Sequence, residues 1–169
     1  ESTGKTNITK IYAAGSGNGS DNTGGGFTAI VDSSNNVYFT GYNVNGQLGT
    51  NDTTQRTSFV LPTGTFQGKV SKVVMGGNMA GAGDALVYIL TTDGDLYSAG
   101  SNQAAIGALG QGLTSNPGAQ LFGKVIRNTD GKKVVDIRLY GNLLVGGAII
   151  LLEDGSLMTT GANASGQGG

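Results

Sequence analysis

The sequence predicts an all-β fold built from four-stranded antiparallel units of about sixty residues. A glycine-rich motif recurs three times, anchored at Gly41, Gly100 and Gly161, which lie 59 and 61 residues apart. Each copy follows a short apolar segment, and nowhere do apolar residues recur at helical spacing over three turns with caps. A pattern that returns at a fixed period indicates a repeat architecture, and we expect almost no helix.

The composition is that of a turn-rich chain with few charges. Its 169 residues include 32 glycines, and the charged fraction of 12% is about half of the roughly 25% that is typical. The formal net charge is −1 and the basic residues are scattered, so we expect no nucleic-acid partner. The absence of cysteine excludes disulfides and thiolate metal sites. No apolar run approaches the roughly 18 residues of a membrane-spanning helix, so we expect no membrane insertion.

The first strand of each unit has apolar residues at its first and fourth positions and glycine at its eighth. The three segments are ITKIYAAG at 8–15, VSKVVMGG at 70–77 and VVDIRLYG at 134–141. Their final glycines are 62 and 64 residues apart, close to the period of the anchor glycines. We therefore expect these segments to begin three equivalent sheets.

A hairpin follows in each unit. The second strands are FTAIVDSSNN at 27–36, ALVYILTTDG at 85–94 and AIILLEDG at 148–155, and the third strands cover 37–40, 96–99 and 157–160. The second strands are rich in large apolar residues and end in Asn or Asp-Gly, which tolerate the positive φ of a tight turn. We expect a two-residue turn in every hairpin.

A fourth strand is expected in TSFVLPTGTF at 57–66 and in AQLFGKVIRN at 119–128. Pro62 suits an edge strand, where a missing backbone donor does no harm. The third unit has no fourth strand, because the sequence ends at Gly169. Both ends fall inside units, which suggests cut edges of a longer chain. The units cover approximately 8–69, 70–133 and 134–169, and four short strands per unit indicate a β-propeller blade or a β-solenoid.

The motif itself resembles that of a known family. NNVYFTGYNVNGQLG, at 35–49, resembles the signature of the regulator-of-chromosome-condensation repeat, in which a turn, an apolar strand, Gly-x-Asn and Gly-Gln-Leu-Gly follow in order. The second unit matches as DGDLYSAGSN, with a two-residue insertion before GALG at 107–110, and the third matches as DGSLMTTGANASGQGG. The resemblance implies that residues 1–169 form one partial β-propeller domain of about two and three-quarter blades.

The resemblance also assigns roles to the motif residues. It implies that Gly41 and its equivalents let a strand end approach neighbouring backbone, and that the Gly-Gln-Leu-Gly block is a tight blade connector with its leucine as an apolar plug. The residues that carry the signature are Gly41, Asn43, Gly46, Gln47, Leu48, Gly49, Gly100, Asn102, Gly107, Leu109, Gly110, Gly161, Asn163, Gly166 and Gln167. The family commonly places a histidine between the first and second strands, and this sequence contains none, so its exchange-factor activity gains no support.

Motifs that suggest catalysis have simpler explanations. The Gly-Lys-Thr at 4–6 precedes a strand instead of the helix that a phosphate-binding loop requires. GSGNGS at 15–20 likewise lacks the helix of a dinucleotide-binding fingerprint. Asp93, Asp95 and Asp154 lie at hairpin turns, where turn chemistry already explains them. We expect no catalytic residue, no metal and no cofactor.

Exposed aromatic and basic side chains are the remaining candidates for partner contacts, because Tyr and Arg are the types that anchor interfaces. We expect Tyr42 and Arg56 to contact a partner. Phe59, Phe122 and Tyr140 could do the same, but we expect them to lie in blade cores.

The function that we infer first is a non-enzymatic attachment segment of a virion or cell surface, hence extracellular. It would bind a protein or surface-glycan receptor through propeller loops, because the Gly, Asn, Thr and Ser content resembles that of fibre and adhesion proteins. The alternative is a cytoplasmic adaptor or regulator that binds a protein partner such as a small GTPase. A propeller lyase or hydrolase is a weaker third hypothesis. We also expect further blades or further copies of the chain, because fewer than about four blades cannot close a ring.

Overall fold

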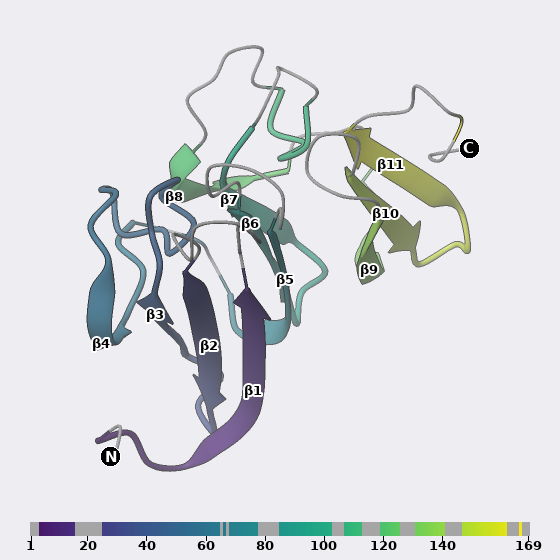
Figure 1. Ribbon diagram of the computed structural model, residues 1–169. Coiled ribbons are helices and arrows are strands. Elements are labelled where there is room, and N and C mark those ends of the chain that lie inside the picture. Colours follow the sequence, from purple (N-terminus) through teal and green to yellow (C-terminus); the bar gives the residue numbers. More distant parts are fainter. Residues whose placement is uncertain are drawn as a thin grey trace.

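The computed structural model describes residues 4–15, 25–64, 66, 68–77, 85–102, 107–112, 119–125, 131–140, 147–161 and 166. Within these ranges the chain forms strands and turns and contains no helix. The strands make three antiparallel sheets that follow one another along the chain and fan out like the blades of a propeller (Figure 1). The expected all-β, partial-propeller fold is confirmed.

Each sheet takes its strands in sequence order. The first blade comprises β1 (Ile8–Gly15), β2 (Gly26–Asp32), β3 (Val37–Gly41) and β4 (Arg56–Val60). The second blade comprises β5 (Val70–Gly77), β6 (Ala85–Thr91), β7 (Leu96–Gly100) and β8 (Ala119–Lys124). The third comprises β9 (Val134–Tyr140), β10 (Gly147–Leu152) and β11 (Leu157–Gly161), and is three-stranded over the described residues. Pro62, expected in an edge strand, follows the end of β4.

The expectation of two-residue hairpin turns is wrong. The loops close by a backbone hydrogen bond to the residue three positions earlier, from Asn35 N to Asp32 O (2.9 Å), from Gly94 N to Thr91 O (3.1 Å) and from Gly155 N to Leu152 O (3.0 Å). These donors have φ of 60°, 85° and 84°. A turn followed by one left-handed residue is the pattern of the three-residue hairpin loop, so the Asn and Gly residues serve the left-handed position of a longer loop.

Acidic residues stabilise these loops. Asp154 Oδ1 accepts hydrogen bonds from Ser156 N (3.0 Å) and Ser156 Oγ (2.6 Å), and Lys132 Nζ lies 2.7 Å from Asp154 Oδ2. The Lys132 ammonium first, and then the Ser156 donors, hold the pKa of Asp154 well below its usual range. This acidic residue therefore has a structural role in its turn.

The core lies between the blades. Alternate residues of β6, such as Val87 and Ile89, face the first blade, whereas Leu86 and Tyr88 face the third. All seven residues of β6 are consequently buried. The innermost strands are adjacent as well, because β1 contacts β5 and β5 contacts β9. Burial of apolar surface between successive sheets is thus the main stabilising contact of the fold.

Aromatic rings fill the space between the first and second blades. The ring centroids of Phe39 and Phe122 are 5.6 Å apart, and Phe66 lies 6.0 Å from Phe122 and 5.9 Å from Tyr97. Phe122 is only 7% exposed, which confirms its expected place in a core. The two other aromatic residues expected in cores, Phe59 and Tyr140, are half-buried.

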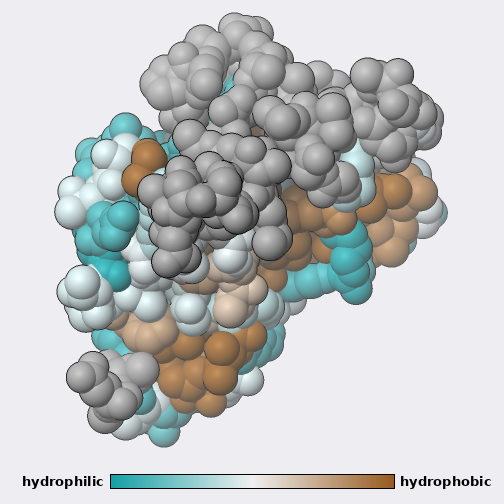
Figure 2. Space-filling view, viewed as in Figure 1, coloured by the Kyte–Doolittle hydropathy of each residue, from teal (hydrophilic) through white to brown (hydrophobic). Residues whose placement is uncertain are grey.

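Apolar side chains are exposed on the two outward faces. Ile11 of β1 is 74% exposed, whereas the residue at the same place in the second blade, Val73, is 2% exposed. Leu157 of β11 is 61% exposed, whereas its counterpart Leu96 is 3% exposed. Figure 2 shows hydrophobic surface over the first blade and over the third. In the second blade the equivalent side chains, Val73 and Leu96, are buried against a neighbouring blade.

Glycines end the third strand of each blade where two backbones crowd together. Gly41 has φ of 103° and Gly100 has φ of 109°. A Cβ added at Gly41 would lie 2.3 Å from Gly26 O, and one added at Gly100 would lie 2.3 Å from Ala85 O. Gly161 has φ of 92° at the same place in the third blade. At Gly41 and Gly100 only glycine fits, because a side chain there would meet both backbone strain and backbone atoms.

We expect Gly100→Ala to destabilise the protein more than Gly155→Ala. Both residues have positive φ, but a Cβ at Gly155 meets nothing within 4 Å. Backbone strain alone predicts a loss of about 1–2 kcal/mol in the free energy of unfolding for Gly155→Ala, and the clash adds roughly 1–3 kcal/mol for Gly100→Ala. Urea denaturation of the two variants measures the difference, and equal losses would contradict the crowding argument.

We expect Lys132→Met to raise the pKa of Asp154 toward the ordinary aspartate value of about 3.9, because the largest cause of its depression is removed. The depressed pKa of this carboxyl group stabilises the folded state at pH values above the pKa of the unfolded chain, and this contribution is lost as the pH falls through the folded pKa. The variant should therefore be less stable at neutral pH and should lose less stability on acidification. Carbon-13 NMR titration of the carboxyl group measures the pKa. Lys133→Met, which alters the neighbouring lysine, is the control, and an equal shift in both variants would refute the assignment.

Candidate functional site

The asparagine of the repeat motif organises the loop that follows β3. Asn43 is fully buried, and its Nδ2 donates to Thr50 Oγ1 (3.1 Å), Asp52 O (3.0 Å) and Thr54 O (3.1 Å). Its Oδ1 accepts a hydrogen bond from Leu48 N at 2.9 Å. The Asn43 side chain thus provides hydrogen-bond partners for backbone groups on both sides of the loop. These bonds hold the loop in place where no neighbouring strand pairs with it.

The Gly-Gln-Leu-Gly block lies against the second blade. Gly46 and Gly49 have φ of 74° and 68°. A Cβ at Gly46 would lie 2.6 Å from Gln120 Cα, and one at Gly49 would lie 2.4 Å from the Phe122 ring. Leu48 is fully buried in the core between these two blades. The block therefore joins the first blade to β8 of the second.

The second unit repeats this arrangement. Asn102 and Leu109 are fully buried, and Leu109 N donates to Asn102 Oδ1 at 3.5 Å. Gly107 and Gly110 have φ of 70° and 66°. In the third unit Gly166 has φ of 73°, while Asn163 and Gln167 lie outside the described residues.

Two buried polar side chains that lie at or against the connectors were not foreseen from the sequence. Gln47 is fully buried and its Oε1 accepts from Asn45 N at 3.0 Å, but its Nε2 has no partner within the described part of the chain. Tyr88 Oη donates to Ala108 O and lies 3.1 Å from Thr160 Oγ1, so a buried polar contact joins the second and third blades. Burial raises the pKa of Tyr88, which stays protonated. A lone tyrosine in an apolar run gives no sequence signal for this role.

The two residues expected to contact a partner are held by their own blade. Tyr42 is half-buried and its side chain covers Gly25, where an added Cβ would lie 2.4 Å from the ring. Arg56 is 21% exposed, and its guanidinium lies 2.6 Å from Asp52 Oδ2. Neither is the freely exposed anchor that the sequence suggested, and their role in partner contacts stays a prediction.

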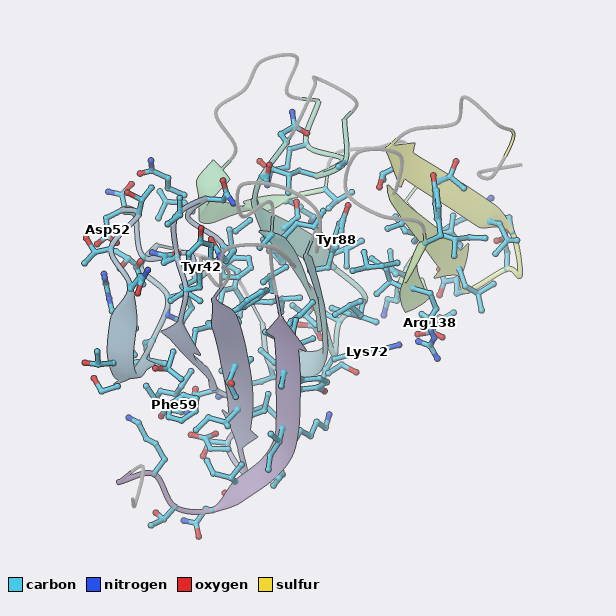
Figure 3. All side chains as sticks on the ribbon, viewed as in Figure 1. Tyr42, Asp52, Phe59, Lys72, Tyr88 and Arg138 are labelled. Carbon is cyan, nitrogen blue, oxygen red and sulfur yellow. The ribbon has the colours of Figure 1, made fainter. Side chains whose placement is uncertain are left out.

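Charged side chains cluster instead on the innermost strands. Lys72 of β5 donates to Asp136 Oδ1 (2.6 Å) and to Ile137 O (3.1 Å) of β9, and Arg138 Nη1 lies 2.7 Å from the same carboxylate oxygen. Lys10 of β1 donates in the same way to Ser71 O of β5. Figure 3 shows Lys72 and Arg138 projecting toward one region at the edge of the second and third blades.

Lys72 and Arg138 border an open hollow of about 470 Å³ across the inner strands of all three blades. Its walls include Tyr12 of β1, Val74 and Met75 of β5, and the Lys72 and Arg138 side chains. Lys72 is 28% exposed and Arg138 is 64% exposed, so both cations remain accessible to solvent. We call this hollow, with its two cations, the inner-strand hollow. It offers apolar contact area beside positive charge, which suits an acidic protein surface.

Within the described residues, no group of three or more His, Cys, Asp or Glu side chains is placed to hold a metal ion. No helix long and apolar enough to cross a membrane occurs in the ranges that the structure describes.

The sequence does carry a signal for the inner-strand hollow that the motif-based expectations missed, because Lys10, Lys72 and Asp136 occupy the third position of the three first strands.

Comparison with known proteins identifies the fold. Neither the protein-family models nor the curated proteins contain a match to this sequence. Three solved structures superpose on it with 16% sequence identity each. Human WBSCR16 matches with a TM-score of 0.63, and the match covers 91% of this chain and 33% of that one. Yeast RCC1 (Prp20) bound to Kap60 matches with a TM-score of 0.65, and the match covers 95% of this chain and 33% of that one. Prp20p from Saccharomyces cerevisiae, described with its binding properties to Gsp1p and histones, matches with a TM-score of 0.64, and the match covers 94% of this chain and 34% of that one.

The chain has the fold of an RCC1-like β-propeller. The resemblance drawn from the repeat motif is confirmed at the level of the fold. The chain spans about a third of the length of the matched structures.

The expected extracellular or virion location is wrong. The matched propellers are a human protein and a yeast protein whose named partners are Kap60, Gsp1p and histones, which are partners inside cells. Composition is a misleading guide to location in this chain, because abundant Gly, Asn, Ser and Thr follow from the many loops of a propeller and do not report a compartment.

We expect Asn43→Ala to lower the free energy of unfolding by about 3 kcal/mol, because Leu48 N and the acceptors around Nδ2 lose their partner in a buried site. Val44→Ala is the matched control, since Val44 is the next residue and is 47% exposed, and its effect should stay within about 0.5 kcal/mol. Thermal and urea unfolding measure both. Similar small losses in the two variants would show that the loop does not depend on the asparagine.

Proposed function

We propose that this chain is a non-catalytic protein-binding module, an adaptor or regulator of the propeller type. It holds an acidic surface of a protein partner, such as a small GTPase, on the inner-strand hollow. The observation that carries the proposal is the pair of solvent-accessible cations, Lys72 and Arg138, beside the apolar wall of Val74 and Met75.

The geometry of the charges supports binding. Lys72 and Arg138 share the single carboxylate of Asp136, so the cluster carries a net positive charge. Asp136 also positions both cations, because its Oδ1 lies 2.6 Å from Lys72 Nζ and 2.7 Å from Arg138 Nη1. Cations held in place before binding lose less side-chain entropy when a partner's carboxylate arrives.

The comparison supports a protein partner. The matched yeast propeller is described in complex with Kap60 and in terms of its binding to Gsp1p and histones. A propeller of this type thus presents surfaces on which proteins dock. The inner-strand hollow supplies one such surface from the inner strands of three consecutive blades.

We expect the double reversal Lys72→Glu/Arg138→Glu to weaken binding to Gsp1p about tenfold or more, because it replaces two attractive charges by repulsive ones. Added salt should weaken binding of the unaltered chain, because it screens the attraction, and should not weaken binding of the variant, in which it screens repulsion. Isothermal titration calorimetry at two salt concentrations measures both effects.

The matched control is Lys69→Glu/Lys133→Glu, which makes the same change in net charge at two lysines that do not border the hollow. It should bind like the unaltered chain. Equal weakening by both double variants would show a non-specific charge effect. No binding of the unaltered chain at concentrations in the hundred-micromolar range would exclude Gsp1p as a partner.

A further inference from the structure

A small slot lies between the second and third blades, away from the inner-strand hollow. Its volume is about 50 Å³, against roughly 10–15 Å³ for a single water position. Leu96, Val125, Val134, Ile150 and Met158 form its apolar floor and walls. The slot is therefore large enough for part of a side chain and is lined for an apolar one.

The equivalent position between the first and second blades shows which side chain can fill such a slot. Between the first and second blades, Phe66 packs against Tyr97, with ring centroids 5.9 Å apart. Tyr97 is the second residue of β7 and Met158 is the second residue of β11, so the two mark equivalent positions. Phe66 precedes the first strand of the second blade, whereas the sequence between Val125 and Val134 contains no aromatic residue. The slot corresponds to the place that a phenyl ring occupies one blade earlier.

The walls of the slot are held rigidly. Val125 N donates to Leu96 O at 2.8 Å, and Val134 N donates to Gly94 O at 3.0 Å. Two ion pairs lie at the mouth of the slot, between Lys124 and Asp95 (2.8 Å) and between Lys132 and Asp154 (2.7 Å). A site that needs no rearrangement loses little free energy to ordering when it binds.

The charges at the mouth restrict the occupant. Among the described residues at the mouth, each lysine is balanced by an aspartate, so this part of the rim has no net charge to attract an ionic group. Charged groups of both signs are nevertheless present to contact polar neighbours of an apolar side chain. The rim thus suits a neutral ring carried by a polar peptide better than it suits a charged side chain.

We propose that this slot is a second binding site, which takes a phenylalanine side chain presented by an extended peptide segment of a partner protein. The ring packs against Val125 and Met158, as the Phe66 ring packs against Tyr97 between the preceding blades, and the flanking peptide lies across the paired charges. The site is independent of the inner-strand hollow, because the two share no lining residue.

The test is a titration of the whole chain, methyl-labelled at Ile, Leu, Val and Met, with the peptide acetyl-Gly-Ser-Phe-Ser-Gly-amide. We expect saturable NMR shifts for the methyl groups of Val125, Val134, Ile150 and Met158, with no comparable shifts at Ile11 or Val135. The peptide with serine in place of phenylalanine should cause none of these shifts. No saturable shift with the phenylalanine peptide, or shifts spread over exposed apolar residues elsewhere, would overturn the proposal.

A matched pair of variants locates the site. Val125→Phe fills the slot from its own wall and should abolish the shifts, whereas Val135→Phe, the same change at a residue that is 50% exposed and does not line the slot, should keep them. Retained binding in Val125→Phe would contradict the proposal. If that variant fails to fold, the titration of the unaltered chain still decides, because saturable and phenylalanine-dependent shifts at the slot methyls are required in any case.

Discussion

The structure depends on apolar contact between successive sheets. The second blade is buried on both of its faces, so that β6 exposes none of its seven residues to solvent, while the first and third blades each keep one face open. A single repeat unit of this kind cannot bury its apolar faces alone. The stability of each blade therefore comes from its neighbours, and the outward faces around Ile11 and Leu157 are the places where this stabilisation is incomplete.

Close packing of sheets requires special chemistry at the strand ends and connectors. Glycine removes the side chain where backbones meet, as at Gly41 and Gly100. Buried polar groups on the connectors then need internal partners, which Asn43 supplies within its own loop and Tyr88 supplies across to the third blade. The repeat motif is consequently a set of solutions to packing, and its recurrence in the three units carries no information about a ligand.

The two surfaces proposed for binding lie where the units differ from one another. The inner-strand cations lie at the edge of the blades, where Lys72 can bond the next blade and still face solvent. The slot between the second and third blades exists because the connection there lacks the aromatic residue found one blade earlier. Differences between units, and not their shared motif, thus distinguish the surfaces of this propeller.

The sequence by itself determined the repeat, the all-β class and the position of almost every strand, because periodic glycines and short apolar runs are local signals. The sequence also led to a wrong expectation, because the hairpin loops have three residues and not two. Asp-Gly suits the left-handed position of a two-residue turn and of a three-residue loop equally well. The tertiary structure alone decided which charges meet. Lys72 and Asp136 are 64 residues apart in the sequence, and only the stacking of β5 on β9 brings them within 2.6 Å. The repeat places Lys72 and Asp136 at equivalent positions of two first strands, but only the packing of these strands against each other shows that the two side chains meet.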